Sequence, residues 1–121
     1  MSEDEGFWLF DLKVETVVGD RDVVCRHIEG ESFMVKGENL VFTKDQKVSM
    51  YALAALLPLL PAMQRELSEH DWMSTDAEIA CPDPHCGGRF RVTKMNKRWF
   101  SHAETTGLPD KRSTPYWKKN E

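Results

Sequence analysis

The N-terminal half of the chain alternates apolar and polar residues in short segments. Residues 7–18 alternate with a period of two, as expected of a half-buried β-strand. Shorter apolar runs follow at residues 23–25, 32–35 and 40–43, and Gly-containing turns separate them. This pattern predicts a small antiparallel sheet.

The pattern then changes to a continuous apolar segment. Residues 50–63 contain no charged side chain, and their apolar residues fall at helical spacing. Two prolines interrupt the segment, and each lacks the amide donor that a helix interior needs. We predict a helix to about Leu57, a kink or break, and a second helical stretch to about Glu69. A helix that is apolar on every side is buried, so this segment is expected to form the main core element.

The C-terminal part is read as a strand, a Pro-rich turn and a final strand, at residues 78–81, 82–84 and 89–94. From Asn96 onward no helical or strand period is visible. We therefore predict two units. Residues 1–95 form a compact α+β domain, with a small antiparallel sheet packed on one Pro-kinked apolar helix. Residues 96–121 form an extended, basic and aromatic C-terminal arm.

Length and composition favour one cytoplasmic domain. The chain has 121 residues, of which 40% are hydrophobic and 30% charged, and this is ordinary globular composition. Its longest apolar segment is shorter than the ~20 residues that span a bilayer, so we expect no membrane helix. The first residues are acidic, unlike a secretory leader, and the three cysteines are too few for a disulfide scaffold.

The net charge of −4 conceals a division of the chain. Residues 1–86 carry 7 Lys and Arg against 17 Asp and Glu, whereas residues 87–121 carry 9 against 3. Such asymmetry predicts that the basic part contacts an acidic surface. That surface could belong to the chain's own body, to a partner protein or to a nucleic acid.

One cluster of residues has the chemistry of a metal site. Cys81, His85 and Cys86 flank a proline turn, and thiolate and imidazole are ligands that Zn²⁺ prefers. His102, or the pair Cys25 and His27, could complete four ligands. The alternative is a structural Pro-rich turn with a half-buried Cys81 and a solvent-facing His85.

A thiol enzyme is a second chemical hypothesis. Cys25 precedes Arg26, and a neighbouring cation lowers a thiol pKa, although a buried Cys at a strand end fits the same residues. The sequence has no Gly-rich phosphate loop, no His-Glu-x-x-His and no nucleophile elbow. A metal- or thiol-dependent enzyme would use Cys25, Cys81, His85 and Cys86.

The arm suggests a binding role. Its aromatic residues are Trp99, Phe100, Tyr116 and Trp117, and aromatic and Arg side chains concentrate binding energy at protein interfaces. Basic residues mixed with aromatics also suit single-stranded nucleic acid, but the acidic body would repel phosphates. We therefore favour a larger protein subunit as the partner and keep nucleic acid as a lower alternative.

Several short motifs occur in order along the chain. They are Cys25, then Glu29-Gly30-Glu31-Ser32-Phe33, an Ala-Leu-rich segment ending in Leu57-Pro58, Trp72-Met73, and Cys81-Pro82-Asp83-Pro84. This order resembles a family of small uncharacterised bacterial and archaeal proteins, in which a Cys precedes a Gly-Asp/Glu-x-Phe turn and a Cys-Pro-Asp-Pro turn opens the last strand.

The resemblance extends over residues 12–94 and implies a compact α+β domain without assigning an activity. Members often have a Cys near the position of Met50, and Cys86 and the residues from Asn96 onward also depart from the family pattern. Taken together, these features predict a non-catalytic small subunit of a larger bacterial enzyme complex, which docks through its C-terminal arm.

Overall fold

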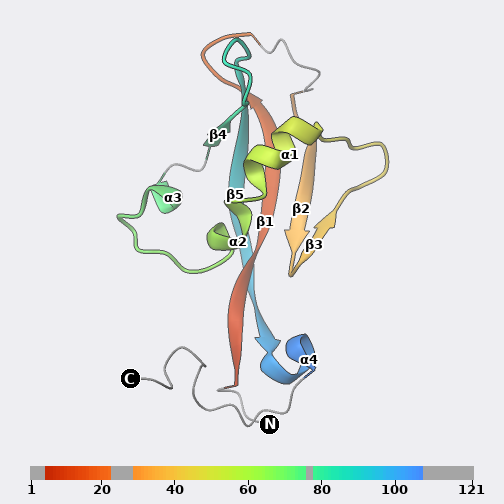
Figure 1. Ribbon diagram of the computed structural model, residues 1–121, viewed down its shortest axis with the longest axis vertical. Coiled ribbons are helices and arrows are strands. Elements are labelled where there is room, and N and C mark those ends of the chain that lie inside the picture. The colour runs from red at the N-terminus through yellow and green to blue at the C-terminus, as the bar shows by residue number, and fades with distance from the viewer. Residues whose placement is uncertain (1–4, 23–28, 76–77, 108–121) are drawn as a thin grey trace.

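The computed structural model describes residues 5–22, 29–75 and 78–107 (Figure 1). Within these residues the chain forms one five-stranded antiparallel sheet and four short helices, which agrees with the predicted α+β class. The strands are β1 (Gly6–Val18), β2 (Ser32–Lys36), β3 (Asn39–Val41), β4 (Glu78–Ala80) and β5 (Gly88–Ser101). The helices are α1 (Met50–Leu56), α2 (Leu60–Met63), α3 (Trp72–Thr75) and α4 (His102–Thr106).

The two longest strands form the spine of the sheet. The strand order is β3-β2-β1-β5-β4, and β1 pairs with β5 from Gly6↔Ser101 to Val18↔Gly88. The predicted alternation in β1 is confirmed, because Leu12, Val14 and Thr16 are all buried. The predicted hairpin between β2 and β3 is also confirmed. The short run at residues 23–25 lies outside the described residues.

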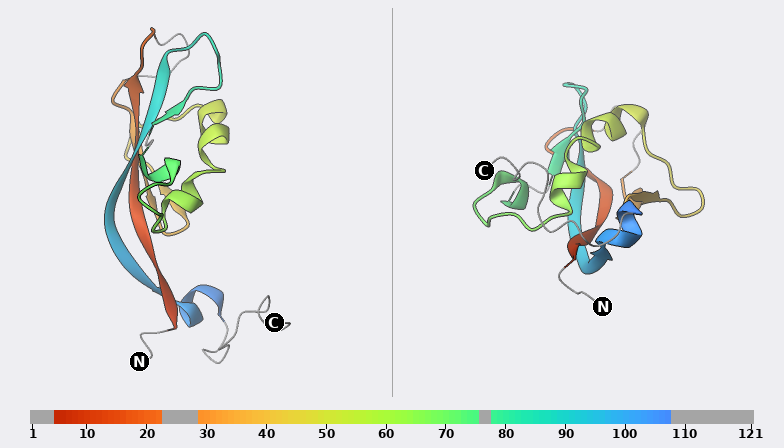
Figure 2. Two further views of the ribbon diagram at one scale, coloured as in Figure 1. Left: turned by 90° about the vertical axis from the view of Figure 1, so that its left-hand side faces the viewer. Right: turned by 60° about the horizontal axis from the view of Figure 1, so that its bottom comes forward.

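The core lies between one face of the sheet and the first two helices. Figure 2 shows α1 and α2 against this face. The core cluster contains Leu12 and Val14 of β1, Phe33 and Val35 of β2, Phe90 and Val92 of β5, Ala52 and Leu56 of α1, Leu60 and Met63 of α2, and Cys81 and Cys86. The two helices therefore share a core with the three central strands.

The apolar segment forms two short helices, so the predicted end of the first helix near Leu57 and the interruption after it are confirmed, whereas one continuous kinked helix is not formed. Ser49 caps α1, because its Oγ accepts a hydrogen bond from the Tyr51 N–H at 3.1 Å. Helix α1 ends before Pro58, whose ring clashes with the preceding turn and whose nitrogen has no proton to donate. Helix α2 ends at Met63, so the predicted continuation to Glu69 is wrong.

The expectation that this segment is buried on every side is also wrong. Met50 is 76% exposed, Tyr51 72% and Leu57 45%, whereas Ala52 and Leu56 are completely buried. A short helix on one face of a sheet can bury only its inner side. The lack of charge along this segment therefore leaves an apolar outer surface.

Strand β5 continues into the part of the chain that was predicted to be an extended arm. Residues 96–101 are the last part of β5, and α4 begins at the next residue. Between the pairs Phe10↔Lys97 and Leu12↔Lys94 the register shifts, so two residues of β5 oppose the single Asp11. This bulge interrupts the period of two, and the sequence therefore looks aperiodic where the strand continues. The predicted boundary after residue 95 falls inside β5, and residues 108–121 are outside the described ranges.

Candidate functional site

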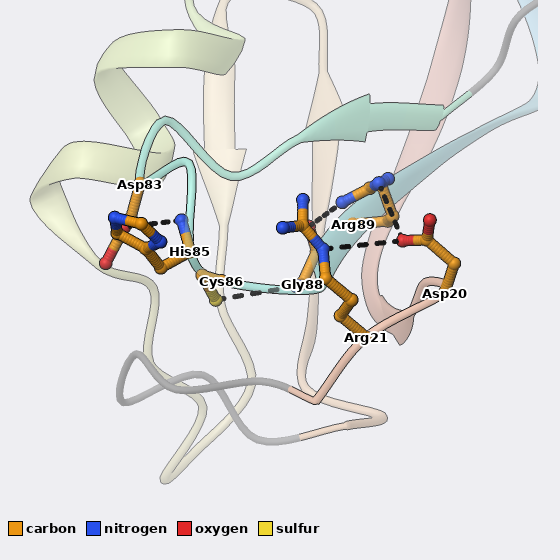
Figure 3. A network of polar contacts seen from close by, with 7 residues as sticks. All are labelled: Asp20, Arg21, Asp83, His85, Cys86, Gly88 and Arg89. Carbon is orange, nitrogen blue, oxygen red and sulfur yellow. Dashed lines mark hydrogen bonds and ion pairs between the residues drawn. The ribbon is translucent and has the colours of Figure 1, made fainter.

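The cysteine turn connects β4 to β5 at one end of the sheet (Figure 3). The Asp83 carbonyl accepts a hydrogen bond from the Cys86 N–H at 3.1 Å, and its Oδ1 accepts one from the His85 N–H at 2.9 Å. Cys86 is 2% exposed and Cys81 8%, and both belong to the core cluster, whereas His85 is exposed. The turn therefore places its two sulfurs inside the protein and its imidazole at the surface.

His102 lies far from this turn. It opens α4 at one end of β5, whereas Cys86 precedes the other end, and β5 has 14 residues. At ~3.3 Å per residue the two lie roughly 40 Å apart along the strand. His102 therefore does not complete a ligand set with Cys81, His85 and Cys86. Within residues 5–22, 29–75 and 78–107, no group of three or more His, Cys, Asp or Glu side chains is arranged to hold a metal. Cys25 and His27 lie outside those ranges, and zinc binding at the turn stays a prediction.

The same end of the sheet is held together by close backbone packing. The Gly87 N–H donates to the Asp22 carbonyl at 2.8 Å, and the Gly87 carbonyl accepts from the Gly19 N–H at 2.7 Å. A Cβ atom at Gly87 would lie 1.8 Å from the Arg21 carbonyl oxygen. The glycine is required there because two backbone segments cross without room for a side chain.

An aromatic cluster lies at the other end of the spine, where β1 and β5 extend past β2 and β4 towards α4 (Figure 1). Trp8 and Trp99 pack edge to face with ring centroids 5.3 Å apart, and Phe7 stacks on Phe100 at 5.7 Å. We call these four residues the aromatic ribbon. Trp99 and Phe100 were predicted binding residues, and the structure joins them to a matching pair in β1 that sequence reasoning missed. The sequence could have indicated this pairing, because Phe7-Trp8 and Trp99-Phe100 contain the same two residue types in reversed order, as expected of residues that face each other in antiparallel strands.

Ion pairs fix the basic residues beside the aromatic ribbon. Asp11 is buried, and its Oδ1 accepts from Arg98 Nε at 2.9 Å and Nη2 at 2.8 Å. Lys97 Nζ lies 2.6 Å from Glu66 Oε1 and 5.2 Å from the centre of the Trp8 ring. The hydrogen bond and the charge of Lys97 lower the pKa of the Glu66 carboxyl. These cations therefore have partners within the protein.

An open hollow of about 840 Å³ lies between the aromatic ribbon, the β2–β3 hairpin and the two core helices. Its apolar lining comes from Phe7, Leu9, Phe100, Leu40, Leu57 and Pro61, and α4 contributes Glu104 and Thr105. Gln64 spans the hollow, because its Nε2 donates to the Gly37 carbonyl at 2.8 Å and its own carbonyl accepts from the Phe10 N–H at 2.7 Å. The two hydrogen bonds of the buried Gln64 thus connect β1 and the β2–β3 turn to the end of α2 beside the hollow.

The chemistry of this lining suits binding. No His, Cys or Ser side chain contributes to the hollow among the described residues, and its charged lining residues are Lys36, Glu38, Arg65, Arg98 and Glu104. An open surface that combines apolar side chains with charged ones is typical of protein contact sites.

Comparison with known proteins identifies no relative. No protein-family model, curated protein or solved structure matches the chain. Among the described helices none is long and apolar enough to cross a membrane. Arguments about function therefore depend on the geometry of the chain itself.

Proposed function

We propose that this chain is a non-catalytic accessory subunit that binds a larger bacterial protein through an exposed apolar surface. The observation that carries the proposal is the outer side of α1 and α2, which has large apolar side chains and no charge between residues 50 and 63. The exposed members of this surface, called here the apolar stripe, are Met50, Tyr51, Ala54, Leu57, Pro58 and Pro61.

The apolar stripe continues into the hollow. Leu57 and Pro61 belong to both, and the hollow carries the surface on to Phe7 and Phe100 of the aromatic ribbon. Burial of one large apolar side chain contributes about 1.5–3 kcal/mol. Covering Met50, Tyr51 and Leu57, all more than two-fifths exposed, would therefore supply several times the thermal energy to a complex.

The C-terminal residues extend this surface in the proposal. Phe100 borders it from β5, whereas Trp99 lies on the other face of that strand beside Trp8. Tyr116 and Trp117, which lie outside the described residues, are expected to contact the same partner. A protein fits better than a nucleic acid because four of the five cations of β5 already have acidic partners within the described residues. Arg98 pairs with Asp11, and a phosphate would have to displace that carboxylate.

The test compares a charge placed inside the apolar stripe with the same charge placed outside it. Tagged wild-type chain, purified from its native host, is expected to elute from size-exclusion chromatography with a larger protein in fixed proportion. Leu57→Glu should lower the recovery of that protein by about tenfold or more, because a charge is buried in the interface. Ser68→Glu, also at an exposed position, should leave recovery unchanged.

Both variants are expected to fold, because both positions are exposed in the isolated chain. Equal recovery with Leu57→Glu and Ser68→Glu would contradict the proposed surface. If the wild-type chain binds a single-stranded oligonucleotide in place of a protein, and Leu57→Glu loses that binding, the nucleic-acid alternative is favoured. A steep decrease of the oligonucleotide affinity with salt concentration would identify this mode of binding.

A further inference from the structure

The methionines in the described part of the chain differ widely in their access to solvent. Met50 is 76% exposed and Met95 45%, whereas Met63 is only 2% exposed in the core cluster. Met34 and Met73 are half-buried. The thioether sulfur of a methionine is readily oxidised to a sulfoxide when an oxidant can reach it. Met50 is therefore the first of these methionines expected to react.

Met50 belongs to the apolar stripe and contributes little to the core. It is the first residue of α1, directly after the cap Ser49. Its neighbours on the outer side of the helix are Tyr51 and, one turn further on, Ala54, and both are exposed. A chemical change at the Met50 sulfur would thus alter the surface of the stripe and leave the core packing intact. The same change at Met63 would place a polar oxygen inside the core.

We propose that Met50 is an oxidation site, and that its conversion to methionine sulfoxide by a peroxide weakens the docking of the partner on the apolar stripe. The thioether sulfur attacks one oxygen of hydrogen peroxide, so that an S–O bond forms and the O–O bond breaks. The sulfur loses two electrons, and the second oxygen takes up a proton and leaves as water. The effect on docking rests on the proposed function, because it requires that the partner covers the stripe.

The physical basis of the effect is the polarity of the sulfoxide. Its oxygen accepts hydrogen bonds, and water supplies them while the chain is free. A partner that covers the stripe with apolar side chains removes this water and supplies no donor in its place. An unsatisfied polar group buried in this way weakens the complex. Oxidation would therefore act on docking, whereas the fold would remain as stable as before.

The site is tested on the folded full chain with dilute hydrogen peroxide. Mass spectrometry of proteolytic peptides measures the amount of sulfoxide at each methionine over time. Met50 should react faster than Met95, and Met63 should react at least about tenfold more slowly than Met50, because the fold excludes the oxidant from it. In concentrated urea these differences should disappear, which would show that they come from the fold.

Three variants separate Met50 from the other oxidisable side chains. Met50→Leu keeps an apolar side chain of similar size, whereas Met50→Gln introduces an amide oxygen without any oxidant. Met95→Gln makes the same change at the bulge in β5, outside the stripe and the lining of the hollow. Both positions are exposed, so all three variants are expected to fold.

The readout is recovery of the larger protein that co-elutes with the tagged wild-type chain. Met50→Gln should lower this recovery by about tenfold, because a polar amide is buried in the interface. Met95→Gln should not lower it. Peroxide treatment of the wild-type chain should have the same effect as Met50→Gln, and Met50→Leu should retain the partner after the same treatment.

A second readout needs no partner. Retention of the folded chain on a phenyl column increases with its exposed apolar surface. Met50→Gln and the peroxide-treated wild-type chain should elute earlier than the untreated wild-type chain. Peroxide should change the retention of Met50→Leu much less.

The possible failures can be told apart. Slower oxidation of Met50 than of Met95, or unchanged retention of Met50→Gln on the phenyl column, would refute Met50 as a site that controls the stripe. If Leu57→Glu loses the partner and Met50→Gln retains it, the proposed function stands and the effect of oxidation on docking is refuted. If no larger protein co-elutes with the untreated wild-type chain, the proposed function fails together with that effect, and the peptide and column measurements still decide the oxidation site.

Discussion

Leu56 and Leu57 are neighbours in sequence and differ in their surroundings. Leu56 is completely buried in the core cluster, whereas Leu57 is 45% exposed at the end of α1. We predict that Leu56→Ala is strongly destabilising and that Leu57→Ala is not. Sequence analysis alone expected both positions to be buried, so the pair tests the orientation of the helix.

The magnitudes follow from burial. Truncating a fully buried Leu loses its transfer free energy and leaves a cavity, so Leu56→Ala should cost ~2–5 kcal/mol. At Leu57 about half of the side chain is already in water and no closed cavity forms, so the cost should be below about 1 kcal/mol. Helix propensity does not obscure the comparison, because Ala and Leu are both strong helix formers.

Equilibrium unfolding in urea, followed by circular dichroism, gives the free energy of unfolding from the midpoint and the slope. Equal losses for the two variants, or a larger loss for Leu57→Ala, would refute the arrangement of α1 on the sheet. Leu57→Glu, the variant used to test partner binding, should unfold at nearly the same urea concentration as the wild type. That result would show that its effect on the partner is local.

Three further predictions concern other parts of the molecule. Gly87→Ala should lower the free energy of unfolding by about 1–3 kcal/mol, since its Cβ would overlap the Arg21 carbonyl, and urea melts would measure the loss. The pKa of Glu66, lowered from the ordinary 4.5 by Lys97, should rise in Lys97→Ala when followed by NMR. Because the folded-state pKa is the lower one, the stabilisation from this pair is present near neutral pH and is lost as pH falls through that value. If the cysteine turn binds zinc, elemental analysis of the purified wild-type protein should find about one zinc ion per chain, and Cys81→Ser should lose it. Wild-type protein purified without metal would contradict the site.

Local patterning was sufficient to predict the strands and the first helix. Alternation over residues 7–18 predicted β1, and Ser49 marked the start of α1. Patterning predicted the first half of β5, at residues 89–94, but missed its continuation to Ser101, because the bulge opposite Asp11 exchanges the faces of the strand halfway along it. The pairing of β1 with β5 involves residues distant in sequence, and no local period specifies which strands become neighbours.

The candidate site was predicted only in part. Trp99 and Phe100 were identified from residue type, but their partners in β1 and the hollow beside them depend on strand order. His102 was grouped with the cysteine turn because both carry metal-binding side chains. Composition does not show that a long strand separates them, and the distance between ligands is set by topology.

The central position of β1 also has a kinetic consequence. This strand is synthesised well before β5, its neighbour on one side, and Gly6 pairs with Ser101. Contacts between such distant residues close long loops before they yield stabilising energy, and folds built on them form slowly. During translation, β1, β2 and β3 can assemble first, but one side of β1 stays unpaired until β5 has left the ribosome. The nascent chain is therefore expected to complete its core late and to be most prone to aggregation just before β5 pairs.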